Sequence, residues 1–156
     1  MKQNSTAKEQ SLNPQPSVRP QPQPAPDSEQ LDERVFAALH AAGEKKAIDP
    51  VVLDLREIAS FTDYFVIVSG ANERQVQAIS DEVYESLKKT GSTAARVEGY
   101  KTAEWILLDY GDFVVHVFEQ KARKFYDLER LWRESKRVSL PPELSGESSS
   151  SLRRES

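Results

Sequence analysis

The residue types that could perform chemistry are few in this sequence. It contains two histidines, His40 and His116, and no cysteine. The lack of cysteine excludes a thiolate nucleophile, a disulfide scaffold and a cysteine-based zinc site. Each histidine lies among apolar residues, without a second histidine at the spacing of a metal-binding motif. We therefore interpret both as structural histidines and expect neither a metal site nor a cofactor.

Carboxylates in a catalytic arrangement are also missing. Phosphoryl transfer with two metal ions commonly uses two aspartates separated by one residue on a strand, and no two aspartates here stand in that relation. A nucleotidyltransferase-like enzyme would have to use Asp54, Asp63 or Asp109 with a divalent metal, and this stays an alternative hypothesis. Ser69–Gly70 follows a predicted strand and precedes a predicted helix, where anions can bind, but no glycine-rich phosphate motif accompanies it. We interpret that pair as a strand-to-helix turn and expect a protein without enzymatic activity.

The composition divides the chain into a middle and two ends. Hydrophobic residues make up 38% of the 156 residues, and the apolar deficit is concentrated at the termini. We expect a disordered Pro/Gln-rich tail over 1–27, one folded domain over 28–137 and a disordered Ser-rich tail over 138–156. No apolar stretch approaches the ~20 residues of a membrane-spanning helix, and the N-terminus lacks the apolar centre of a signal peptide. We therefore expect a cytoplasmic protein that does not enter a membrane.

The elements that must position any site are predicted from hydrophobic periodicity. Helical spacing covers 28–43, 73–89 and 120–133, while strand patterns cover 51–55, 64–68, 95–97, 105–110 and 113–118. The segment 64–68 is nearly all apolar, which is typical of a central strand buried on both faces. We predict one α/β domain with a mixed sheet of about five strands covered by helices.

The last two predicted strands form a hairpin with two different sides. Gly111–Asp112 suits a two-residue turn, and this turn would pair Trp105 with Phe118. The core-facing side would then hold Ile106, Leu108, Tyr110, Phe113, Val115 and Val117. The other side carries Trp105, Leu107, Val114 and Phe118. Either the last helix covers this second side, or it forms an exposed apolar patch of the kind that binds a partner.

The predicted last helix lies in the basic part of an otherwise acidic domain. Residues 120–137 contain seven Lys/Arg against three Asp/Glu, whereas the whole chain has a formal net charge of −4. We interpret this segment as a solvated cationic helix face, with direct RNA contact as a secondary hypothesis.

A series of short motifs resembles one protein family. The motifs occupy 53–55, 62–67, 69–70, 74–76, 98–99, 105–112, 114–118 and 126–132. In this order they resemble the ribosomal silencing factor family, also called RsfS or Iojap-like, over about residues 30–133. The resemblance implies a nucleotidyltransferase-like topology that lacks the catalytic carboxylates, in agreement with the missing aspartate pair.

The resemblance also implies a function and a site. Members bind the large ribosomal subunit through its fourteenth protein and sterically block the small subunit, which represses translation, notably when nutrients are short. The implied contact residue is Trp105, with Glu98, Leu107, Asp109 and Tyr110 as neighbouring partner-binding positions. Tyr110 also belongs to the core-facing set, so packing is an equally open role for it. An acidic domain suits a basic ribosomal protein better than RNA, and a homodimeric adaptor that pairs through the hairpin remains an alternative.

Overall fold

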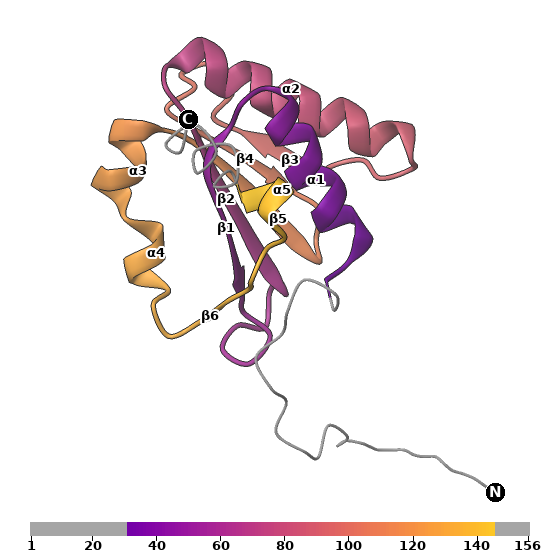
Figure 1. The fold of residues 1–156 in the computed structure, drawn as a ribbon, viewed down its shortest axis with the longest axis vertical. Helices are drawn as coiled ribbons and strands as arrows, with labels where there is room; N and C mark the ends of the chain where they lie inside the picture. Colours follow the sequence, from indigo (N-terminus) through magenta and orange to yellow (C-terminus); the bar gives the residue numbers. More distant parts are fainter. Residues whose placement is uncertain (1–30, 146–156) are drawn as a thin grey trace, which may run out of the picture.

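The computed structural model describes residues 31–145 (Figure 1). The predicted tail over 1–27 and the part of the predicted second tail over 146–156 lie outside these residues. The first residues of the predicted N-terminal helix, 28–30, lie outside them as well.

A mixed sheet of six strands organises the domain, in the order β3-β4-β5-β2-β1-β6. The strands are β1 (Ile48–Asp54), β2 (Tyr64–Gly70), β3 (Arg96–Glu98), β4 (Trp105–Asp109), β5 (Phe113–Glu119) and β6 (Lys136–Arg137). The central pair β2 and β5 is parallel, and every other pair is antiparallel. The predicted α/β class is confirmed, and the two-residue β6 adds a sixth strand to the predicted five.

Helices cover the two faces of the sheet unequally (Figure 1). The helices are α1 (Glu33–Glu44), α2 (Glu73–Lys89), α3 (Gln120–Tyr126), α4 (Leu128–Leu131) and α5 (Pro142–Ser145). The two long helices, α1 and α2, pack with the larger apolar cluster on one face. The short helices α3 and α4 pack with a smaller cluster on the other face through Ala122 and Leu128. Among residues 31–145, no helix has the length and apolar character needed to cross a membrane.

The second helix follows its local sequence signals closely. The predicted range 73–89 is confirmed, and the Asn72 side chain caps its first turn by accepting a hydrogen bond from the Gln75 backbone N–H at 2.9 Å. The apolar residues at helical spacing in this range are fully buried; they are Val76, Ile79, Val83 and Leu87. By contrast, α1 begins at Glu33 with Asp32 as its cap, later than the predicted start at Ser28.

The predicted helix over 120–133 is wrong as a single element, because the chain breaks it into α3 and α4. Asp127 lies between them with a positive φ of 50°, a left-handed conformation that no α-helix continues through. The break turns two of the apolar side chains of this segment outward: Phe125 is 79% exposed and Leu131 is 70% exposed. Leu128 is buried and Trp132 packs against the smaller cluster, as the periodicity predicts.

The folded structure extends past the predicted boundary at 137. The backbone N–H of Val138 donates to the carbonyl of Val52 at 2.9 Å, and the Val138 side chain is buried. Leu140 and Leu144 then pack against the larger apolar cluster. Residues 138–145 therefore belong to the domain rather than to a tail, because they continue the pairing with β1 and carry apolar side chains to the α1 side.

Candidate protein-docking face

Strand register brings four of the five predicted partner-binding residues to one face of the sheet. Glu98 of β3 pairs with Leu107 of β4, and Trp105 and Asp109 alternate with core residues along β4. Because alternate residues of a strand point to the same side, these four side chains share the face toward α3 and α4. We call Glu98, Trp105, Leu107 and Asp109 the docking face.

Tyr110 belongs to the opposite side, so its predicted partner contact does not fit the structure. Its side chain is only 8% exposed and its ring stacks on Phe113, with 4.9 Å between ring centroids. Burial raises the pKa of its hydroxyl to about 12. Its buried hydroxyl has no hydrogen-bond partner among residues 31–145. Of the two roles open from the sequence, packing is the one that this position supports.

The half-buried indole of Trp105 is held in one orientation by three neighbours. It stacks on Phe118, with 4.8 Å between ring centroids and 28° between ring planes. Its ring centroid also lies 4.8 Å from that of Tyr126. Its Nε1–H donates a hydrogen bond to Nδ1 of His116 at 3.1 Å. The part of the ring that stays accessible is therefore presented by a side chain that is already ordered.

His116 accepts the hydrogen bond from Trp105 and is itself buried. The imidazole is 3% exposed and meets the ring of Phe65 edge-on, with 4.5 Å between centroids. Burial lowers the pKa of His116 to about 3, outweighing the opposite influence of Asp109. The neutral ring therefore accepts from Trp105 at Nδ1, which places its own proton on Nε2. The prediction of a structural histidine is confirmed for His116, but no pattern in the sequence indicated that its partner is Trp105.

The acidic residues of the docking face share one cation. Arg96 contacts Glu98 at 3.0 Å and Asp109 at 3.4 Å. These pairs are exposed or partly exposed, since the Glu98 side chain is 55% accessible and that of Asp109 is 26% accessible. Exposed ion pairs contribute little to stability, so a cation from a partner can compete with Arg96 at little cost.

The second side of the hairpin is covered only in part. Phe118 and Val114 are buried in the smaller cluster with Ala122 and Leu128 of α3 and α4. Trp105 and Leu107 are only partly buried at the edge of that cluster. The helices α3 and α4 therefore cover this side as one of the two predicted outcomes requires, but they leave part of Trp105 and Leu107 accessible.

The aspartates of the alternative enzyme hypothesis do not converge. Asp54 is buried and receives three hydrogen bonds from Arg56, at 3.0, 3.0 and 3.1 Å. Asp63 is exposed beside β2, whereas Asp109 lies on β4, on the far side of β5. Among residues 31–145, no three His, Cys, Asp or Glu side chains are placed to hold a metal ion.

The polar groups of Ser69–Gly70, at the end of β2, are engaged by the protein itself. The Ser69 hydroxyl is buried and accepts a hydrogen bond from Nη1 of Arg123 at 2.9 Å. Arg123 also binds Glu129 through two hydrogen bonds, at 3.0 and 3.1 Å. The predicted turn is displaced by two residues, because Ser69 and Gly70 are the last residues of β2 and pair with Phe118 and Glu119 of β5, and the turn to α2 follows at 71–72. The hydroxyl of Ser69 helps to fasten α3 and α4 to the sheet.

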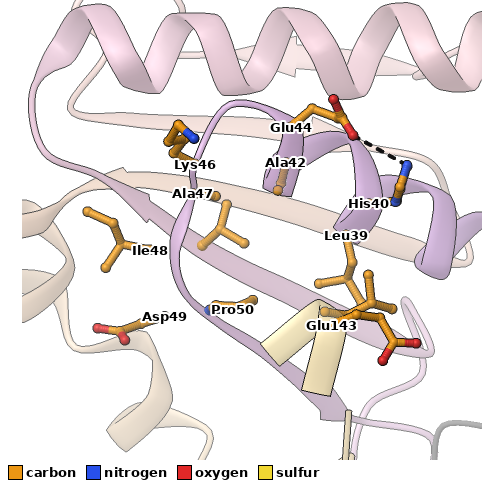
Figure 2. Close-up of a pocket in the computed structure, with 13 residues that line it drawn as sticks. Leu39, His40, Ala42, Glu44, Lys46, Ala47, Ile48, Asp49, Pro50 and Glu143 are labelled. Atoms are coloured by element: carbon orange, nitrogen blue, oxygen red, sulfur yellow. Dashed lines mark ion pairs between the residues drawn. The ribbon is translucent and has the colours of Figure 1, made fainter. Parts of the chain in front are cut away.

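A pocket with a volume of about 600 Å³ lies between the end of α1, the start of β1 and α5. Figure 2 shows its lining, with His40 and Glu44 paired at 3.5 Å on α1 and Asp49 near the start of β1. The charges of Glu44, Lys46, Asp49 and Glu143 are of both signs and do not converge on one point. The pocket lies on the α1 side of the sheet, away from the docking face, and we assign no ligand to it.

Comparisons with known proteins agree with one another. The family model described as "Ribosomal silencing factor during starvation" matches residues 28–156. The "Ribosomal silencing factor RsfS" of Halalkalibacterium halodurans is 41% identical over 108 residues, covering 69% of this chain and 92% of the relative. A crystal structure of a Chromobacterium violaceum protein has a TM-score of 0.64 and 33% identity, covering 70% of this chain and 88% of that one. The "Mitochondrial assembly of ribosomal large subunit protein 1" of Mus musculus is 32% identical over 92 residues, covering 57% of this chain and 40% of the relative.

Proposed function

The chain belongs to the ribosomal silencing factor family, and we propose that it binds the large ribosomal subunit through the subunit's fourteenth protein. Bound there, it sterically blocks joining of the small subunit and so represses translation. The protein acts in the cytoplasm, and its effect is occlusion of a surface rather than catalysis.

The observation that carries this proposal is the docking face. A half-buried tryptophan that is ordered before binding loses little conformational entropy when a partner covers it, which is typical of an interface hot spot. Glu98 and Asp109 beside it give the face an acidic rim. An acidic rim around an aromatic anchor fits a basic protein surface, as ribosomal proteins offer, through complementary charge.

The relatives support the choice of subunit. The mouse relative is named for assembly of the large ribosomal subunit, and the bacterial relative is named as a silencing factor. Both names describe regulation or assembly of ribosomes rather than a chemical reaction. The unconverged aspartates of this chain give no support to the alternative of a metal-dependent nucleotidyltransferase.

Co-sedimentation with isolated subunits tests the proposal directly. The full chain should pellet with large subunits but not with small ones, and it should lower the fraction of joined ribosomes when both subunits are mixed. The Trp105→Ala variant should lose both effects together. Equal pelleting with both subunits, or with neither, would contradict the proposal.

Self-association is a separate outcome that the same face allows. A second copy of the chain could occupy the docking face and compete with the ribosome. Sedimentation velocity at rising protein concentration measures this, and Trp105→Ala should abolish any dimer that forms through the face. A dimer that persists in that variant would use another surface.

A further inference from the structure

Charge is strongly segregated along this domain. Residues 28–119 contain nine Lys/Arg against seventeen Asp/Glu, whereas residues 120–137 contain seven Lys/Arg against three Asp/Glu. The basic segment forms α3, α4 and β6, and α3 and α4 lie together at one outer edge of the molecule (Figure 1). The domain therefore has a cationic edge next to an acidic body.

Four cations of this edge have no carboxylate partner among residues 31–145. Arg123 and Arg137 pair with Glu129, and Lys136 pairs with Glu57. The remaining four, all exposed, are Lys121, Lys124, Arg130 and Arg133. Their charge is uncompensated locally, which favours binding of an anion with several charges.

Large apolar side chains lie exposed among these cations. Phe125 is 79% exposed between Lys124 and Tyr126, and Leu131 is 70% exposed beside Arg130. The ring centroid of Tyr126 lies 5.0 Å from that of Phe125 and 4.8 Å from that of Trp105. The cationic edge therefore continues directly into the docking face. A purely solvated cationic surface would not need to expose these side chains.

We propose that the outer surface of α3 and α4, formed by Lys121, Lys124, Phe125, Arg130 and Arg133, binds the phosphate backbone of RNA. Phosphates repel the acidic body of the domain, so this edge is the part of the described structure that RNA can approach. The biological identity of that RNA rests on the proposed function: it is ribosomal RNA beside the protein that the docking face contacts. The surface would contribute affinity and orientation without reading base sequence.

A short RNA hairpin probes the surface independently of the ribosome. Fluorescence anisotropy with the full chain should show binding that weakens steeply as KCl rises. In K121Q/K124Q the dependence of log K on log salt should be shallower by about 1–2, and affinity at low salt should fall about tenfold. R130Q/R133Q should behave in the same way. The matched control is K88Q/K89Q, which removes two exposed cations at the end of α2 on the other face of the sheet.

The outcomes separate this inference from the proposed function. Equal hairpin affinity in wild type and K121Q/K124Q would overturn it, as would an equal loss in K88Q/K89Q. Equally tight, equally salt-dependent binding of poly-glutamate would also overturn it, because the partner would then be an acidic protein. If the hairpin binds as expected while large subunits do not co-sediment, the RNA surface stands and the proposed function fails. Thermal melts of all variants should match wild type, since the substituted side chains are exposed.

Discussion

Trp105 is accessible to a partner while its orientation is already set by Phe118, Tyr126 and His116. The proposed interface requires this combination of its anchor residue. Phe118 and His116 are buried, whereas Tyr126 is 46% exposed, so the two buried neighbours can affect binding only indirectly. Substitutions at Trp105 and at His116 should therefore have different signatures.

Trp105→Ala should weaken binding to large subunits by at least about 2 kcal/mol, roughly thirtyfold, because it removes the aromatic anchor of the face. Stability should fall by less, since the ring is only partly buried. Binding is measured by quantitative co-sedimentation, and stability by urea unfolding. A loss of stability as large as the loss of binding would show that Trp105 is chiefly a packing residue.

His116→Leu should release the indole while keeping the fold. The variant removes the Nδ1 acceptor of the 3.1 Å bond and fills the site with an apolar side chain. Binding should weaken by about 1 kcal/mol, and the indole N–H resonance of Trp105 should shift in NMR spectra. His116→Asn keeps an acceptor near the position of Nδ1. It should recover part of the lost binding and return the indole resonance part of the way to its wild-type position. An unchanged indole resonance in His116→Leu would contradict the assigned bond.

His116 should also make stability depend on pH. Its pKa is lowered from 6.5 to about 3 in the folded protein, so the unfolded chain takes up a proton first as pH falls. The contribution of His116 is constant above about pH 6.5 and is lost as pH falls from there toward 3. Between pH 7 and pH 5, wild type should lose about 2 kcal/mol more than His116→Leu in urea unfolding. Parallel losses in the two proteins would show that the imidazole is not buried neutral.

At the scale of the elements, the break at Asp127 decides the shape of the basic edge. Its left-handed conformation ends α3 and lets α4 start in a new direction, while Arg123 ties both helices together through Glu129. The two short helices can then bury Ala122 and Leu128 while exposing Phe125.

Substitution at Asp127 tests this conformation. Asp127→Gly should be neutral or slightly stabilising, because glycine adopts positive φ without steric cost. Asp127→Val should destabilise by about 1–2 kcal/mol, because a β-branched side chain is strained there. Urea unfolding of both variants measures the difference. If valine were tolerated as well as glycine, a continuous helix over 120–133 would be the better description.

On the scale of the whole molecule, the C-terminal segment closes the sheet beside β1. Val138 is buried, and Leu144 of α5 packs on the cluster under α1. A chain ending at residue 137 should therefore be less stable than one ending at 145, by about 2 kcal/mol or more from the lost apolar burial. Thermal melts of the two chains provide the measurement. Equal melting temperatures would support the predicted end of the domain at residue 137.

Much of the fold was predictable because it follows local rules. The range of α2, the apolar β2 and the register of the hairpin, with Leu108 opposite Val115, are confirmed. Each depends on periodicity or turn chemistry within a few residues. The break at Asp127 was not predictable in this way, since aspartate at positive φ is uncommon and its helical neighbours continue the same apolar spacing on both sides.

The sequence by itself determined the α/β order of elements, the two sides of the hairpin and, through its motifs, the family and the candidate position Trp105. Only the tertiary structure decided that Tyr110 packs inside, that His116 holds the indole, and that residues 138–145 belong to the domain. The physical reason is that these properties depend on contacts between residues far apart in the chain. Local propensity carries no information about which distant side chain will cover a given face.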